Sequence, residues 1–320
     1  MAAATRPGTY SIAFYNVENL FDTINDPGVN DEAFTPDGFF KWTPKRLKKK
    51  IERLATTIVQ IGNPDNTYPP AMIGLAEVEN HTVLDMLVEH PVMAPYGYGY
   101  IHFPSPDERG IDVAMLYRKS FFSIVESTNH RIDLKDDDGL PDATRDILEV
   151  GGTFNGVPLR VFVNHWPSRR SGVAESEHRR MEASRVLSTL VDARDEEYQL
   201  ILGDFNDEPG SKSIQQLESH GFFNPMDTLR SFTRGSLNHQ RTWYVFDQIL
   251  VSHPFLSPRA KISFEKADIY DPEYLKEQKG RFKGQPFRTY GGGRYLGGYS
   301  DHFPVYVITQ MPEQRQDGVK

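Results

Sequence analysis

The chain of 320 residues contains no cysteine, so it can form neither a disulfide nor a thiolate metal site. Any metal ion would therefore be held by oxygen or imidazole ligands. No apolar run approaches the length of a membrane span, and the opening MAAATRPGTY has no apolar stretch of signal-peptide length. We expect a soluble protein without a transmembrane segment. The compartment stays open, because a lack of cysteine also fits an exported protein whose signal peptide has been removed.

Positive charge is also scarce relative to negative charge. The chain has 36 Lys and Arg residues against 44 Asp and Glu residues, and its net charge is −8. Proteins that bind long nucleic acids are usually basic, since neutralisation of phosphates drives their affinity. The charge balance argues against a long duplex as the partner, although a local basic patch could still hold a nucleic acid.

Short runs rich in β-branched and aromatic residues predict strands. They cover residues 9–17, 71–78, 111–118, 147–154, 157–166, 198–205, 243–251 and 303–309, and the NGV turn at 155–157 predicts a hairpin. One helix is expected to begin at Pro44 after an N-cap at Thr43, and another to cover about 173–194. The KRLKKK run at 45–50 is interpreted as the solvated face of the first helix, with a phosphate-binding patch as the alternative.

Strands mixed with helices, some of them hairpin-linked, indicate an α+β protein with mixed sheets. The sequence shows no repeat and no low-complexity linker. We therefore expect a single domain over residues 1–320, with flexible tails at about 1–8 and 311–320.

Polar side chains gather at the ends of the predicted strands, where loops from distant parts of the chain converge. The set comprises Asn16, Glu18, Glu77, Glu79, Asn164, His165, Asp204, Asn206, Asp301 and His302. Taken singly, each Asp or Asn is more simply a turn residue. Asp247 differs, because a carboxylate inside an apolar strand is costly unless it is paired, and His302 is a candidate partner.

Several carboxylates, few candidate histidines and no thiol suit a hard cation such as Mg²⁺ or Mn²⁺. Histidines beside such a cation suit phosphoryl chemistry, in which charge on the phosphate must be neutralised.

Six segments follow the order of the motifs of the endonuclease/exonuclease/phosphatase superfamily, which the chain resembles from Tyr15 to Val305. These segments are YNVENL, GLAEVEN, VNHWP, LGDFND, FDQILVS and SDHFPV. That family includes abasic-site endonucleases, pancreatic-type deoxyribonucleases, inositol polyphosphate 5-phosphatases and neutral sphingomyelinases. The resemblance implies a four-layer α/β/β/α sandwich, in which two packed mixed β-sheets are flanked by helices and the site lies at one end.

The same resemblance implies a set of metal ligands. Glu77 matches the glutamate that binds the catalytic Mg²⁺ or Mn²⁺, and Asn16 matches the asparagine that supports it. Glu18 falls where some members have a second acidic metal contact, and Asp301 matches an acidic residue near the metal.

The resemblance also implies the catalytic residues. Asp204 matches the aspartate that orients or deprotonates the attacking water, and Asn206 matches the asparagine that holds a phosphate oxygen. Asp247 and His302 match an Asp–His pair. His165 matches a histidine close to the scissile phosphate in the deoxyribonuclease, phosphatase and sphingomyelinase branches. The general base stays open between Asp204 and the Asp–His pair.

Three residues are candidates for substrate binding: Asn164, Arg169 and Arg145. Arg169 and Arg170 follow His165 in PSRRSG and could hold a second phosphate or a headgroup, although a solvated pair is equally consistent with the sequence. Arg145 precedes a predicted strand and could face the mouth of the site.

We therefore expect a divalent-metal-dependent phosphoesterase that hydrolyses a phosphodiester or phosphomonoester by in-line attack of water, as a nuclease or a small-phosphoester hydrolase. One alternative is a phospholipid-headgroup hydrolase of the sphingomyelinase type, for which the FFSI segment at 121–124 is the candidate membrane contact. The other is a catalytically silent binding protein with the same fold. The expected partner is the phosphoester substrate, and no protein partner is evident.

Overall fold

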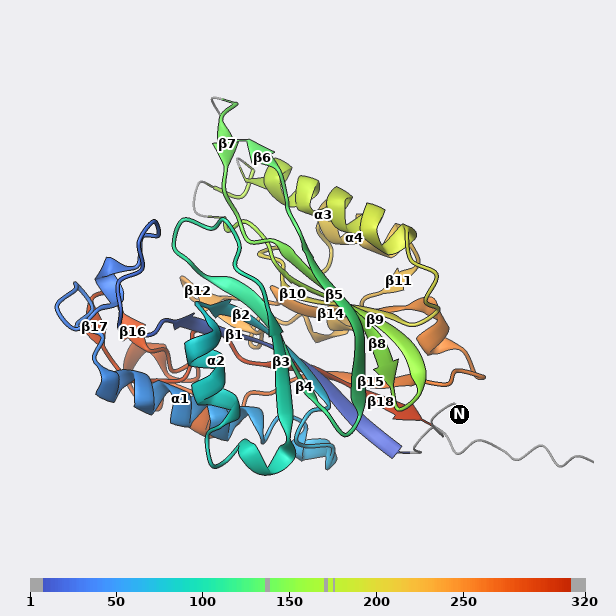
Figure 1. Cartoon of the computed structure of the whole chain (residues 1–320), viewed down its shortest axis with the longest axis horizontal. Helices are drawn as coiled ribbons and strands as arrows, with labels where there is room; N and C mark the ends of the chain where they lie inside the picture. The colour runs from blue at the N-terminus through green and yellow to red at the C-terminus, as the bar shows by residue number, and fades with distance from the viewer. Residues whose placement is uncertain (1–7, 136–138, 170–171, 175, 312–320) are drawn as a thin grey trace, which may run out of the picture.

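The computed structural model describes residues 8–135, 139–169, 172–174 and 176–311. Two six-stranded sheets pack face to face within these residues, and helices cover their outer faces (Figure 1). The first sheet has the order β15 (Ser263–Ile269), β18 (Val305–Met311), β1 (Gly8–Leu20), β2 (Met72–Val78), β4 (Asp112–Arg118) and β3 (Tyr98–His102). The second has the order β11 (Phe222–Phe223), β14 (Asp247–Ser252), β10 (Gln199–Asp204), β9 (Val157–His165), β8 (Ile147–Phe154) and β5 (Phe122–His130). The expected four-layer sandwich is confirmed.

Both sheets are mixed, because each has one parallel pair at its centre. β1 runs parallel to β2, and β9 runs parallel to β10, while the flanking pairs are antiparallel. A Cβ atom on Gly74 of β2 would lie 3.1 Å from Val163 and 3.3 Å from Leu202 of the opposite sheet. Glycine at this position therefore lets the two sheets approach closely, which brings the ends of their central strands together.

The helices lie in two outer layers. α1 (Pro44–Ile58) and α2 (His81–Val88) cover the first sheet, and α3 (Glu177–Asp192) and α4 (Lys212–Ser219) cover the second (Figure 1). The start of α1 is as predicted, since the Thr43 hydroxyl accepts a hydrogen bond from the amide of Arg46 and Pro44 is the first helical residue. No helix within the described residues is long and apolar enough to cross a membrane.

Short hairpins complete the chain. They pair β12 (Leu237–His239) with β13 (Thr242–Tyr244), β16 (Tyr290–Gly291) with β17 (Arg294–Tyr295), and β6 (Leu134–Lys135) with β7 (Pro141–Asp142). The prediction of one strand over 243–251 is wrong. β13 belongs to a hairpin, whereas β14 inserts between β10 and β11, so the apolar run bends between them and Asp247 becomes the first residue of a sheet strand.

The two ends of the described chain lie side by side. Gly8 pairs with Met311 at the antiparallel junction of β1 and β18. Residues 1–7 and 312–320, where flexible tails were expected, lie outside the described residues.

Candidate active site

In the first sheet, β1 and β2 lose their regular pairing beyond Asn16. Glu18, Asn19 and Glu77 there have φ angles of 52°, 51° and 66°. This left-handed region is costly for residues other than glycine and is concentrated at functional sites. The bulge is held by two hydrogen bonds: the Glu18 amide donates to Asn16 Oδ1 at 3.0 Å, and the Asn19 amide donates to Glu77 Oε2 at 2.8 Å. It thereby presents two carboxylates at one end of the sandwich.

In the second sheet, strand pairing brings three further residues to the same end. Asp204 at the end of β10 is in register with His165 of β9 and with Asp247 of β14. Asp204 Oδ2 accepts a hydrogen bond from Asn16 Nδ2 of the first sheet at 3.0 Å, and Oδ1 accepts one from the Asn206 amide at 3.0 Å. The site is therefore assembled across the interface between the two sheets.

His302 joins this cluster from the segment that precedes β18. Its Nδ1 lies 2.7 Å from Oδ2 of the fully buried Asp247. Its Nε2 lies 3.9 Å from Asp204 Oδ2 and 4.0 Å from Asp301 Oδ1. Burial alone would lower the pKa of His302, but the carboxylates of Asp247, Asp204 and Asp301 outweigh it and hold that pKa well above its usual value. The carboxylates thus favour the protonated ring, whose Nδ1 is hydrogen-bonded to Asp247.

His165 is held in the opposite charge state. Its Nε2 lies 3.7 Å from Asp204 Oδ2. Burial, reinforced by the positive charge of Arg145, lowers the pKa of His165 well below its usual value, so the ring is neutral. Its buried Nδ1 has no hydrogen-bond partner among the described residues.

Asp204 lies between these two histidines. Burial raises its pKa to about 6, although the charge on His302 opposes the rise. Asp204 is therefore ionised at neutral pH but is a stronger base than an ordinary aspartate.

Glu18, Asp301 and Arg288 form an ionic cluster beside His302. We call this cluster the mouth of the site. Arg288 places Nη2 2.7 Å from Asp301 Oδ2 and Nε 3.5 Å from Glu18 Oε1. Glu18 Oε2 accepts a hydrogen bond from the Thr289 amide at 2.6 Å. Burial and the nearby charge of Asp301 raise the pKa of Glu18 to about 7. The charges of Lys50 and Arg288 oppose this rise.

Sequence reasoning missed the part that Lys50 plays here. Lys50 is buried, and its Nζ donates to Thr289 Oγ1 at 2.6 Å and to the Tyr299 carbonyl at 2.5 Å. Burial lowers the pKa of Lys50 to about 8, against the opposing effect of the Glu18 carboxylate. Lys45, Lys48 and Lys49 are exposed as expected, so the interpretation of KRLKKK as a solvated face is right for these three and wrong for Lys50. Arg46 is half-buried and donates to the Phe40 carbonyl. The role of Lys50 could not be recognised from the sequence, because Lys50 is one of several basic residues in a row.

Two sets of side chains at this end of the sandwich could hold a divalent cation. Asp204, Asp247 and His302 bring ligand atoms to within 4.8 Å of one another. In this set, however, His302 Nδ1 is hydrogen-bonded to Asp247. A protonated ring nitrogen has no lone pair to offer a metal ion, so this set is the less suitable of the two.

The second set is Glu77, Asp301 and Glu18, which offers only oxygen atoms and whose three carboxylates act on the nearby Lys50 and Arg288. That chemistry fits a hard divalent cation. The carboxylates of this set lie farther apart than the ligand atoms of the first set. Among the described residues, these three do not bring one oxygen each to within 4.8 Å of the others.

The model of the Endonuclease/Exonuclease/phosphatase family matches residues 11–311. The chain belongs to this family. Members of the family are metal-dependent phosphoesterases, and the chain is accordingly a phosphoric ester hydrolase. A comparison with curated proteins finds no match.

Solved structures of the family share the fold. Humanized D. rerio TDP2 is 16% identical with a TM-score of 0.60, over 94% of this chain and 98% of that chain. Bacteroides thetaiotaomicron mannosyl-6-phosphatase is 18% identical with a TM-score of 0.56, over 94% and 99%. The human Nocturnin catalytic domain, with bound sulfate, is 16% identical with a TM-score of 0.54, over 95% and 93%. At these identities the likeness shows the sandwich and not the substrate.

The three residues expected to bind substrate all have intramolecular partners. Asn164 is fully buried, and its Oδ1 accepts a hydrogen bond from Trp166 Nε1 at 3.2 Å. Arg145 is also buried and donates to Asp107 Oδ2 at 3.0 Å and to the Trp166 carbonyl at 2.8 Å. Both residues thus support the backbone that follows His165.

Arg169 supports the loop that follows Asp204. Its Nε donates to the Asn206 carbonyl at 2.7 Å, and its Nη2 donates to Asp207 Oδ1 at 2.6 Å. Asn206 has a φ of 49°, and its Nδ2 donates to the Trp166 carbonyl at 3.0 Å. Arg170 lies outside the described residues.

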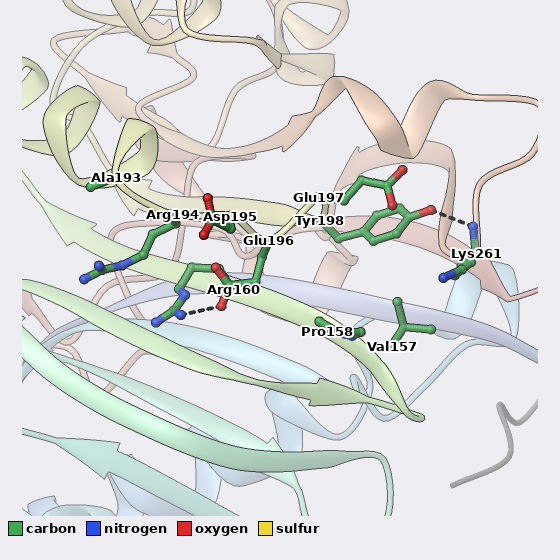
Figure 2. A pocket seen from close by; sticks show the side chains of 10 residues that line it. All are labelled: Val157, Pro158, Arg160, Ala193, Arg194, Asp195, Glu196, Glu197, Tyr198 and Lys261. Carbon is green, nitrogen blue, oxygen red and sulfur yellow. Dashed lines mark hydrogen bonds and ion pairs between the residues drawn. The ribbon is translucent and has the colours of Figure 1, made fainter. Parts of the chain in front are cut away.

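The recess drawn in Figure 2 lies away from this family site. It has a volume of about 600 Å³ and is lined in part by Val157 and Tyr198. Val157 begins β9 and His165 ends it, roughly 26 Å apart at about 3.3 Å per residue of strand. Its Arg160 is already paired with Glu149 and Glu196. We therefore place the chemistry at the His302 end of the sandwich.

Proposed function

We propose that the chain hydrolyses a phosphodiester or phosphomonoester by in-line attack of a water molecule that Asp204 deprotonates. The observation that supports this assignment best is the position of His302, whose Nδ1 is hydrogen-bonded to Asp247 and whose Nε2 lies 3.9 Å from Asp204 and 4.0 Å from Asp301. These carboxylates favour a protonated ring, which cannot accept a proton, and this supports Asp204 rather than the Asp–His pair as the base. Asp204 is the remaining base within reach.

His302 then acts as a donor. Its Nε2–H stabilises the charge that develops on the phosphate oxygens or on the departing oxygen. Asp247 keeps the ring protonated and oriented from the other side. His165, which is neutral, and the second amide hydrogen of Asn206 supply further hydrogen bonds to the phosphate.

We assign the cation to Glu77 and Asp301, with Glu18 beside them. Mg²⁺ or Mn²⁺ held there would neutralise charge on the phosphate. We give Asn16 a positioning role instead, because its Oδ1 accepts from the Glu18 amide and its Nδ2 donates to Asp204. Asn164, Arg145 and Arg169 act likewise through the backbone that carries His165 and Asn206.

Unpaired arginines beside the mouth support a substrate with more than one anionic group. Arg288 contributes to two recesses of about 400 and 620 Å³. Arg241 and Arg281 line the first, and Arg281 and Arg294 line the second. Unlike Arg288, the side chains of Arg241, Arg281 and Arg294 have no carboxylate oxygen within 4.0 Å in the part of the chain that the structure describes. Such a concentration of free positive charge in an acidic chain suits a polyanion.

A short nucleic-acid strand is the polyanion that we propose first. D. rerio TDP2, 16% identical with a TM-score of 0.56, has been solved with a single strand DNA product. In the FFSI segment of the phospholipid alternative, Phe122 is buried, whereas Ile124 and the following Val125 are exposed, so this segment does not decide between the two substrates.

A substrate panel tests this function. Single-stranded DNA, RNA, plasmid, inositol phosphates and sphingomyelin are each incubated with the wild type, with R281Q/R294Q and with the control K212Q/R185Q, which removes two exposed charges on α3 and α4. We expect hydrolysis of single strands with a KM about tenfold higher in R281Q/R294Q, and no change in the control. Hydrolysis of sphingomyelin alone, or of no phosphoester beyond the level of D204N, would contradict the proposal.

A further inference from the structure

A second group of carboxylates lies beside α2, in the loop that follows β1 and at the end of β2. Asp26, Asp31 and Glu79 each bring one carboxylate oxygen to within 4.8 Å of the others. Within the described residues, no Lys, Arg or His side chain lies within 4.0 Å of these carboxylates. Three acidic groups therefore converge without a cationic partner.

Two of these carboxylates each have a buried oxygen without a partner. Asp31 is 1% exposed and Glu79 is 6% exposed. Asp31 Oδ2 accepts from the Asp26 amide at 2.9 Å, and Glu79 Oε2 accepts from the Asp22 amide at 2.5 Å. Asp31 Oδ1 and Glu79 Oε1 are buried and accept no hydrogen bond from any described residue. Burying a carboxylate oxygen without a hydrogen-bond or ionic partner costs free energy of folding. A bound cation would remove this cost.

Asp22 belongs to the same segment but is already satisfied. Its Oδ1 accepts from the Ile24 amide at 2.6 Å, and its Oδ2 accepts from Asn80 Nδ2 at 3.1 Å. Asn80 Nδ2 also donates to Glu79 Oε2 at 3.1 Å. These bonds hold the loop against the end of β2 and orient Glu79, which leaves Glu79 Oε1 for a ligand.

We propose that Asp26, Asp31 and Glu79 bind a hard divalent cation of the Ca²⁺ type, separate from the catalytic cation. All three donors are oxygens, which excludes a preference for a soft metal. Ca²⁺ accepts six to eight oxygens in irregular geometry, so water can complete a site built on a loop, whereas Mg²⁺ demands a near-ideal octahedron. The ion would tie the loop over residues 22–31 to Glu79, two positions beyond Glu77.

A proton is the competing occupant of this site. Burial, together with the charges of Asp22 and Asp26, raises the pKa of Glu79 to about 8. A Glu79 that simply stays protonated would relieve the repulsion without any metal, and the two explanations predict different binding results.

Calcium binding is measured by isothermal titration calorimetry on the full chain in an E77Q background, which removes a ligand of the catalytic cation. We expect E77Q to bind one Ca²⁺. Adding D26N should weaken that binding at least tenfold, because the Asp26 carboxylate accepts no hydrogen bond from a described residue and its loss should not disturb the fold. Adding E32Q, which removes the same charge from an exposed neighbour, should change nothing.

The unfolding temperature provides a second readout that does not depend on activity. Ca²⁺ should raise the Tm of E77Q and E77Q/E32Q in proportion to the logarithm of its concentration, and raise the Tm of E77Q/D26N less at each concentration. The proposal is overturned if E77Q binds no Ca²⁺ at about 10 mM, above the range of weak protein sites. It is also overturned if D26N and E79Q retain the affinity of their parent.

Discussion

Nδ1 of His302 lies 2.7 Å from Oδ2 of Asp247, although 55 positions separate the two residues. Asp247 begins β14 in the second sheet, and His302 precedes β18 in the first. The contact therefore bridges the two sheets at the end where Asp204 and Asp301 also lie. It favours the protonated form of His302, and the proposed roles of His302 as a hydrogen-bond donor and of Asp204 as the base depend on that proton.

Replacing Asp247 by Asn should remove the main source of this charge. We expect the pKa of His302 to fall, because burial then acts against fewer carboxylates, and kcat to fall about 10²- to 10³-fold. NMR titration of the imidazole protons measures the first effect and steady-state kinetics the second. D192N is the matched control, since Asp192 forms an exposed pair with His220 away from the site. An unchanged pKa of His302 in D247N would refute the assignment.

The rate of hydrolysis should decrease as the pH falls through the pKa of Asp204. Burial raises that pKa to about 6, and the base acts only in its ionised form. The profile of kcat/KM should therefore rise with pH, reach half of its limit near pH 6 and level off above about pH 7. In D204N the acidic limb should disappear and the residual rate should be low. A rate that increases on acidification would exclude a carboxylate base.

Replacing Lys50 by Met should destabilise the fold by about 3 kcal/mol, because a buried cation near Glu18 is lost. The exposed neighbour Lys49 serves as the control, and K49M should have little effect. Urea unfolding measures both. The double variant K50M/E18Q should recover part of the loss, since Glu18 then needs no cation. Equal stability of K50M and K49M would mean that the charge of Lys50 does not compensate the buried Glu18 carboxylate.

Glu149 should make the stability of the second sheet dependent on pH. Burial acts to raise its pKa, but hydrogen bonds from His130 and Arg194 prevail and lower it to about 2, against 4.5 for an ordinary glutamate. Its contribution is thus present above pH 4.5 and is lost as the pH falls towards 2. We expect a loss on the order of 2 kcal/mol in urea unfolding. E149Q should lack this loss, and identical pH profiles for the two proteins would contradict the assignment.

The layered fold and the end at which the site lies could be predicted from the sequence. Strand patterns located most of the central strands, and polar site residues lie at the ends of β1, β2, β9 and β10. The structure brings Asp204, Asp247 and His302 together, as their shared resemblance to one family implied.

The pairing of Asp247 with His302 was predicted, but the partners of most other side chains could not be. Lys50 lies on a helix of known periodicity, yet its contacts come from Thr289 and Tyr299, which are 239 and 249 positions away. Arg145 and Asn164 likewise sit near the expected site, but their burial follows from Trp166 and the packing of the second sheet. Local sequence patterns do not contain such long-range contacts.

Metal-dependent hydrolysis of bis-p-nitrophenyl phosphate tests the central claim most directly. Purified wild type and D204N are assayed with Mg²⁺ or Mn²⁺, with a chelator, and with the chelator followed by excess metal. We predict turnover that the chelator abolishes and excess metal restores, with D204N at least 10²-fold slower at equal metal concentration. Turnover that persists in the chelator, or that is equal in D204N, would contradict the account.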